Sequence, residues 1–167
     1  MWSLCINRYI NFQIDSMDKA QLIADLCKWS ATSENGFFVT LNGLTYDKIS
    51  FEQDLGKFAH KLNDYCYGRA YKRKDKRLKI IAGVESGQLN RMLHAHLVIQ
   101  HDDQMRRTLT EVNAFIRSQW YGFIGLRNSR GNMVNIAPLG IVETRISYIT
   151  KDTNYLNRNG YFNLIWL

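Results

Sequence analysis

The sequence is short of residues that interrupt, cross-link or anchor a fold. It has one proline among 167 residues and no low-complexity segment, so we expect an ordered chain. Its three cysteines, Cys5, Cys27 and Cys66, are an odd number without metal-type spacing, which favours reduced thiols in an intracellular, cytoplasmic protein. No apolar run is long enough to span a membrane, and the first residues lack a signal peptide's pattern. These absences argue against a disulfide scaffold, a secreted protein and a membrane protein.

Acidic residues are outnumbered by basic ones. Lysine and arginine total 22 against 15 for aspartate and glutamate, which gives a net charge of +7 and a pI of about 9.4. This excess favours a polyanionic partner, either nucleic acid or an anionic membrane, although basic proteins without such a partner are common. Hydrophobic residues make up 46% of the chain, enough for the core of a single domain spanning residues 1–167.

Apolar periodicity divides the chain into helices and strands. Helical spacing covers 15–29, 50–66 with Ser50 as the cap, 108–120 and 141–152. Strand-like stretches are 9–14, 36–41, 78–85, 92–100, 132–139 and 160–167, and residues 67–77 are expected to form a basic loop. The strands at 78–85 and 92–100 are too close in sequence for a parallel crossover and should form an antiparallel hairpin. We therefore expect an α+β fold, an antiparallel sheet covered by helices.

Two histidines give the predicted hairpin its chemical character. Side chains alternate across a strand, so His94 and His96 share one face while the apolar residues between and around them share the other. On the preceding strand, Glu85 and Gly83 would lie on the histidine side. Gly83 would leave room beside the rings, and Glu85 would be close enough to act as a third ligand.

Two imidazoles and one carboxylate form a divalent-metal site with positions open to water or phosphate oxygens. Nitrogen ligands favour Mn²⁺ over Mg²⁺, although Mg²⁺ could serve in cells. Two surface histidines on a solvated sheet would give the same pattern. Other histidine families fit less well: a histidine-triad hydrolase needs a third alternating histidine where Val98 stands, and an amidohydrolase barrel needs about 250 residues.

The segment 141–152 has two stripes at helical spacing. Val142, Ile146 and Ile149 form the apolar stripe, and the polar stripe comprises Thr144, Arg145, Tyr148, Lys151, Asp152 and, further on, Tyr155. Tyr148 and Lys151 project from one side of the helix. A nearby cation or metal ion would stabilise a phenolate and so activate a tyrosine as a nucleophile. The alternative is an amphipathic tyrosine at the edge of the core.

Three short motifs follow one another along the chain: Phe38, Val39 and Thr40; His94, Ala95 and His96; and Tyr148 with Lys151. Their order resembles that in the HUH endonuclease superfamily, specifically its single-tyrosine Rep-type initiators of rolling-circle replication in plasmids and viruses. The match extends over residues 36–155, which would form the motif-bearing core, with residues 1–35 as a peripheral strand and helix. Ala95 is a small residue for its position, which is a mild departure.

The resemblance implies a ferredoxin-like sheet of about five strands with His94 and His96 on a middle strand. It also implies a metal-dependent reaction in which Tyr148 attacks a phosphate of single-stranded DNA, leaving a 5′-phosphotyrosine and a free 3′-hydroxyl. Lys151 would stabilise phosphate or phenolate charge. Tyr155, two helical turns on, is the alternative second nucleophile.

The expected substrate is single-stranded DNA at a replication origin, including a hairpin origin. A basic run supplies the candidate DNA-binding residues Lys72, Arg73, Lys74, Lys76 and Arg77, with Arg106, Arg107, Arg127 and Arg130 as further candidates. This run could equally be an ordinary solvated loop. No phosphate-binding loop motif is present, so we expect no helicase domain and a dependence on a host helicase and polymerase.

Three alternatives remain open. A single-tyrosine transposase of the same superfamily shares the motif order. A relaxase is disfavoured because relaxases place the tyrosine near the N-terminus and usually carry three metal-binding histidines. From another class, a basic DNA-binding module without catalysis would bind DNA but form no covalent adduct.

Overall fold

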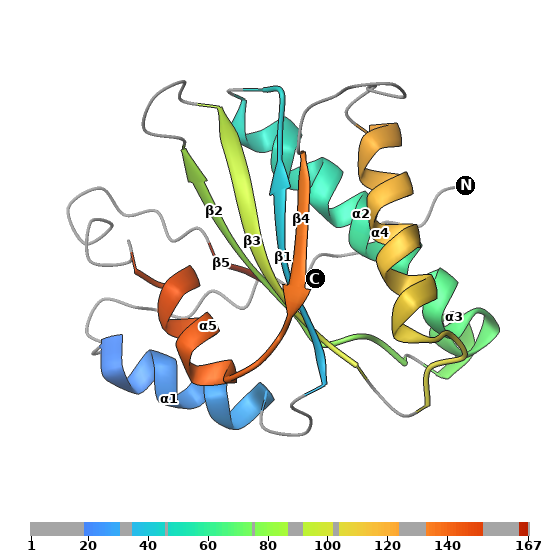
Figure 1. Cartoon of the computed structure of the whole chain (residues 1–167), viewed down its shortest axis with the longest axis horizontal. Helices are drawn as coiled ribbons and strands as arrows, with labels where there is room; N and C mark the ends of the chain where they lie inside the picture. Colours follow the sequence, from blue (N-terminus) through green and yellow to red (C-terminus); the bar gives the residue numbers. More distant parts are fainter. Residues whose placement is uncertain are drawn as a thin grey trace.

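The computed structural model describes residues 19–30, 35–45, 47–74, 76–86, 92–101, 104–123, 133–151 and 164–166 (Figure 1). Its helices are α1 (Lys19–Ser30), α2 (Lys48–Tyr67), α3 (Arg69–Lys74), α4 (Leu109–Phe123) and α5 (Val142–Ile149). Its strands are β1 (Gly36–Asn42), β2 (Ile80–Ser86), β3 (Leu93–Gln100), β4 (Val134–Pro138) and β5 (Leu164–Trp166). The stretch 9–14, predicted as a strand, and the residues Asp152, Tyr155, Arg127 and Arg130 lie outside the described residues.

The strands form one sheet in the order β4-β1-β3-β2-β5, and all the pairings are antiparallel. The α+β class is therefore confirmed. Apart from the short α3, the run β1–α2–β2–β3–α4–β4 has the ferredoxin-like arrangement of two interlocked β-α-β units. Four strands form the body of this sheet, one fewer than the resemblance implied. The three-residue β5 adds only a short pairing at the edge of β2.

The predicted hairpin is also confirmed. β2 and β3 pair in a register that sets Glu85 opposite His94 and Gly83 opposite His96. β3 lies between β1 and β2, so both histidines are on a middle strand of the sheet. Because β1 pairs with the other side of β3, Thr40 stands opposite His96.

The two faces of the sheet are covered differently (Figure 1). One face packs against α2 and α4, where the alternate residues of β1 and β3 join a large apolar cluster that includes Leu41, Leu97 and Trp120. The other face meets α1 and α5 at one end, where Phe38 and Val98 lie in a smaller cluster with Ile146 and Ile149. The remainder of this second face carries Thr40, Glu85, His94 and His96.

Two helix starts show how side chains cap the backbone. Ser50 was wrongly expected to cap α2; the helix begins earlier because the Asp47 carboxylate accepts hydrogen bonds from the amides of Ile49 and Ser50 at 3.2 and 3.3 Å. Before α4, Thr108 and Glu111 bond reciprocally: the Thr108 amide donates to the Glu111 carboxylate at 2.8 Å, and the Glu111 amide donates to the Thr108 hydroxyl at 3.3 Å. Such caps satisfy amide groups that the helix itself leaves unpaired.

The expected basic loop at 67–77 is partly helical. Gly68 ends α2 with a φ of 55°, a conformation that favours glycine, and α3 begins at the next residue. Tyr71 anchors this short helix because its side chain is buried in the large cluster. The run 69–74 has no stripe of apolar residues, so a single buried aromatic residue holds this helix against α2.

Cys27 and Cys66 are free thiols, as expected, and Cys5 lies outside the described residues. Burial raises the pKa of the Cys66 thiol to about 12, although the charge of Arg107 acts to lower it. None of the helices in the described part of the chain combines the length and apolar character needed to cross a membrane.

Candidate metal centre

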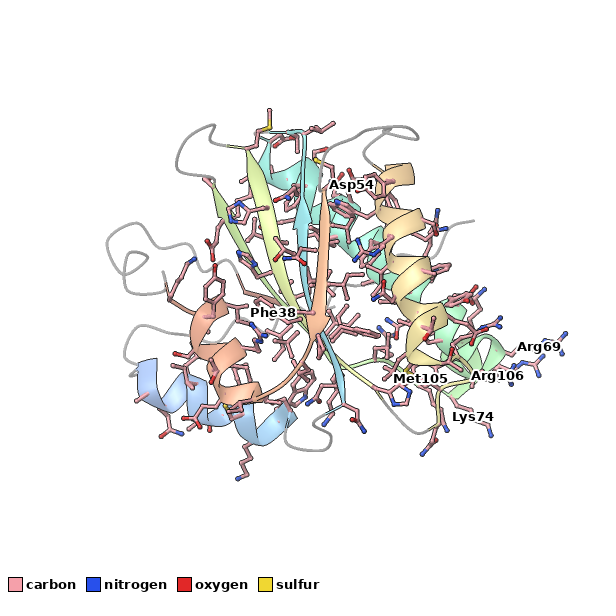
Figure 2. The ribbon with its side chains drawn as sticks, in the orientation of Figure 1. Phe38, Asp54, Arg69, Lys74, Met105 and Arg106 are labelled. Carbon is pink, nitrogen blue, oxygen red and sulfur yellow. The ribbon has the colours of Figure 1, made fainter. Side chains whose placement is uncertain are left out.

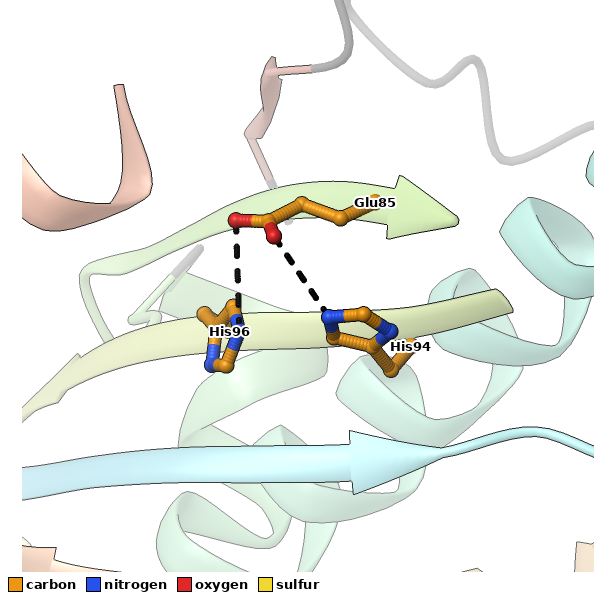
Figure 3. A group of neighbouring side chains, drawn as sticks. All are labelled: Glu85, His94 and His96. Carbon is orange, nitrogen blue, oxygen red and sulfur yellow. Dashed lines mark ion pairs between the residues drawn. The ribbon is translucent and has the colours of Figure 1, made fainter. Parts of the chain in front are cut away.

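Glu85, His94 and His96 converge on the open part of the sheet face (Figure 3). The Nε2 atom of His94 lies 3.5 Å from Oε2 of Glu85, and Nε2 of His96 lies 3.9 Å from Oε1 of Glu85. One ligand atom from each of the three residues lies within 4.8 Å of the others, a grouping that could hold a metal ion. The β2–β3 register produces this grouping directly, since neighbouring strands place paired side chains on the same face.

His96 is the more enclosed of the two imidazoles, with 7% of the residue exposed. Burial lowers its pKa to about 4; the Glu85 carboxylate acts in the opposite direction, and His94 and Lys151 add to the lowering. Its ring is therefore neutral at physiological pH, which is the form in which an imidazole binds a metal ion. The 3.9 Å approach of His96 Nε2 to Glu85 Oε1 is therefore not an ion pair while the ring is neutral.

The Glu85 carboxylate itself supports a cation at this place. Its Oε1 atom is buried and has no hydrogen-bond partner within the described part of the chain. A buried acceptor without a partner costs free energy unless something satisfies it. Two atoms bound to one ion at about 2.1 Å lie no more than about 4.2 Å apart, and both histidine–glutamate separations, 3.5 and 3.9 Å, meet this limit. The three residues could therefore hold a divalent ion, and their donors suit Fe²⁺ and Zn²⁺ as well as Mn²⁺.

Helix α5 approaches the sheet where Gly83 stands. A Cβ atom at Gly83 would lie 2.7 Å from the carbonyl oxygen of Ile149, far inside normal contact distance. The prediction that Gly83 leaves space beside the imidazoles is therefore wrong in detail. The space above it is filled by the end of α5, and this close approach brings Tyr148 and Lys151 toward the metal centre.

Tyr148 and Lys151 both reach the triad from α5 and its C-terminal end. The Tyr148 ring stands edge-on to His96, with centroids 5.0 Å apart, and 43% of the residue is exposed. The Lys151 ammonium lies 3.0 Å from Oε2 of Glu85 and 4.3 Å from the centroid of the Tyr148 ring. Partial burial acts to lower the pKa of Lys151, but hydrogen bonding and charge interaction with Glu85 and Tyr148 outweigh it and raise that pKa.

Three residues that sequence reasoning left without a specific role complete the surroundings. Phe38 stacks parallel to His96 with centroids 5.8 Å apart, and it meets Tyr148 edge-on at 5.8 Å. The Arg145 guanidinium covers the Phe38 ring at 4.5 Å, and its Nε donates to the Leu139 carbonyl at 3.1 Å. Thr40 places its hydroxyl 3.0 Å from Nδ1 of His96. Phe38 and Thr40 belong to the first motif, but only the strand register reveals which ring they contact.

The candidate DNA-binding residues do not lie in this centre. α3 packs with α2, and its buried Tyr71 joins the cluster on the opposite face of the sheet from the triad. Figure 2 shows Arg69, Lys74 and Arg106 extending from this end of the molecule. Lys72 forms an ion pair with Asp64 at 3.2 Å, Lys76 donates to Gln104, and Arg77 covers the Tyr71 ring at 5.4 Å. Arg73 and Lys74 are exposed.

Two aromatic residues of α4 lie on the other side of the sheet. Trp120 is fully buried and donates from Nε1 to the Asn42 carbonyl at 2.9 Å. Tyr121 is half-buried and packs beside the large cluster. Neither belongs to the face that carries the triad.

Comparisons with protein-family models, with curated proteins and with solved structures find no match to this chain.

Proposed function

We propose that this protein is a metal-dependent enzyme that nicks and joins single-stranded DNA, with Tyr148 as the nucleophile. The observation that carries the proposal is the placement of a half-exposed phenol at 5.0 Å from the ring of a candidate metal ligand, with Lys151 between it and Glu85. A metal-binding triad alone suits many reactions. A tyrosine and a lysine beside it favour phosphoryl transfer to the phenol.

The proposed reaction forms one phosphorus–oxygen bond and breaks another. The phenolate oxygen of Tyr148 would form a bond to phosphorus while the bond between phosphorus and the 3′-oxygen breaks. The phenol's proton leaves to solvent, and the departing 3′-oxygen gains one, so the products are a 5′-phosphotyrosine and a 3′-hydroxyl. One phosphodiester replaces another, and attack by a 3′-hydroxyl on the phosphotyrosine therefore rejoins a strand.

Each residue of the site has a distinct task in this reaction. Glu85, His94 and His96 would hold the ion, and its chemistry when bound is Lewis-acid polarisation of the scissile phosphate by Mn²⁺ or Mg²⁺. Lys151 carries positive charge beside the phenol and stabilises the phenolate before attack. Phe38 contacts both the Tyr148 and His96 rings, and so it fixes the spacing between nucleophile and ligand.

The substrate would be single-stranded DNA at an origin, as in replication initiation, with host helicase and polymerase as partners. Transposition uses the same chemistry, and it is the alternative role for an enzyme with this nicking and joining activity. The exposed cations of α3 would contact phosphates of DNA outside the cleavage site, because α3 lies on the other face of the sheet. A net charge of +7 supports this affinity for a polyanion.

The test uses a labelled single-stranded oligonucleotide pool, Mn²⁺ and a denaturing gel that retains covalent protein–DNA adducts. Wild type should give a DNA-linked band, and Tyr148→Phe should lose it by at least about 10³-fold while still binding DNA. Tyr65→Phe is the matched control: Tyr65 stacks on Phe115 with centroids 4.0 Å apart in the opposite layer, and its loss should leave the adduct unchanged. DNA binding without any adduct in the wild type would instead identify a non-catalytic module.

A further inference from the structure

Thr40 makes a contact with His96 that strand packing alone does not require. The two residues face each other across the β1–β3 pair, and the Thr40 hydroxyl oxygen lies 3.0 Å from Nδ1 of the imidazole. The other ring nitrogen, Nε2, faces Oε1 of Glu85 at 3.9 Å. The hydroxyl therefore contacts the nitrogen that points away from the metal centre.

The position of the ring proton decides whether His96 can bind an ion. A neutral imidazole carries one N–H, and the other nitrogen holds the lone pair. With the proton on Nε2, an N–H would point at Glu85 Oε1, but 3.9 Å is too long for a hydrogen bond and that oxygen has no partner within the described residues. With the proton on Nδ1, the ring donates to Thr40 and the lone pair on Nε2 faces the carboxylate.

We propose that Thr40 is a positioning residue that keeps the His96 proton on Nδ1 and its Nε2 lone pair aimed into the metal centre. The inference rests on the metal binding proposed above and assigns it a residue outside the ligand set. Histidine ligands generally donate their second N–H to a neighbouring acceptor, and loss of such an acceptor costs about 10- to 100-fold in metal affinity.

The surroundings make Thr40 a rigid acceptor. β1 is paired on both sides, by β3 and by β4, and a β-branched side chain on a strand has few χ1 rotamers. Phe38, two residues earlier on the same face, lies parallel to the imidazole with an interplanar angle of 3°. Phe38 therefore restrains the plane of the ring, and Thr40 favours the χ2 orientation that sets Nδ1 beside its hydroxyl.

Two substitutions separate the hydroxyl from the shape of the side chain. Thr40→Val keeps the shape and removes the acceptor, and Thr40→Ser keeps the acceptor and removes a methyl group. Titration of the purified full chain with Mn²⁺ by calorimetry should show affinity about 10- to 100-fold weaker for Thr40→Val and within about threefold of wild type for Thr40→Ser. A valine variant that binds Mn²⁺ as wild type does, or a serine variant as weak as the valine one, overturns the proposal.

A second readout needs no metal. Nitrogen NMR of the metal-free protein should place the wild-type and Thr40→Ser His96 proton on Nδ1, and Thr40→Val should shift this tautomer balance. His60 is the internal control, because its Nδ1 lies 2.9 Å from the Tyr71 hydroxyl in the opposite layer and its signals should not move. A wild-type His96 protonated on Nε2 rejects the role of Thr40. Failure of wild type to bind Mn²⁺ instead rejects the proposed function, and the NMR result still decides the tautomer.

Discussion

The two faces of β3 differ in what they demand of the sequence. On one face Ala95, Leu97 and Ile99 are completely or almost completely buried against α2 and α4. On the other, His94 and His96 join Glu85 in the candidate metal centre while Val98 is covered by the α1 and α5 layer. One strand thus supplies both the core and the candidate site, separated only by the alternation of its side chains.

This difference predicts that substitutions on one face of the sheet change the stability of the fold, and that substitutions on the other face change metal binding. Residues of the large cluster contribute mainly through buried apolar area, whereas the triad residues contribute through charge and lone pairs. Residues on the two faces of the sheet should therefore give opposite phenotypes, and three experiments test how complete that separation is.

The largest expected effect on folding comes from Leu97→Ala. Leu97 is fully buried, and truncating such a residue costs about 2–5 kcal/mol, measured by denaturant unfolding. His94→Ala, on the other face, should change the unfolding free energy by less than about 1 kcal/mol and abolish Mn²⁺ binding. If His94→Ala destabilised the fold as much as Leu97→Ala, the two faces would not be independent.

An intermediate effect is expected from Gly83→Ala, which tests how α5 is held against the sheet. The added methyl group would meet the Ile149 carbonyl at 2.7 Å and should cost about 1–3 kcal/mol of stability. Because α5 must move, adduct formation through Tyr148 should fall more than Mn²⁺ affinity does. Equal losses in both measurements would mean that the nucleophile and the ligands are not positioned separately.

The smallest effect is expected from charge removal on α3. Arg73→Gln with Lys74→Gln changes two exposed residues on the layer opposite the triad. DNA affinity should weaken, and the slope of log affinity against log salt should fall by about 1.4 in total for single-stranded DNA. Mn²⁺ affinity and thermal stability should not change. Loss of Mn²⁺ binding would contradict the separation of the two surfaces.

Local patterns predicted the triad because its geometry is local. Alternation on β3 put His94 and His96 together, and a short hairpin connection brought Glu85 beside them. The register of β1 against β3 could not be predicted in this way, because Thr40 and His96 are 56 residues apart and no turn fixes their pairing. The close approach of α5 at Gly83 is likewise a tertiary contact, because a glycine in a strand does not indicate which element packs against it.

The predictions of the α2 cap and of a loop at 67–77 were wrong for a different reason. Asp47 and Ser50 are both good capping residues, and the choice between them depends on where the chain leaves β1, which the sequence does not state. The run 69–74 is too polar to show a helical stripe, and only the burial of Tyr71 marks its inner side. Weak local signals are decided by tertiary contacts.

The ligands and the nucleophile belong to separate pieces of the molecule. Glu85, His94 and His96 are fixed in the sheet, whereas Tyr148 is carried by a helix that rests on it through Ile146 and Ile149. A DNA end joined to the Tyr148 phenol would be attached to the protein through α5. A force on that DNA would act on the α1–α5 layer, and the metal-binding residues in the strands would stay in place to receive the next 3′ end.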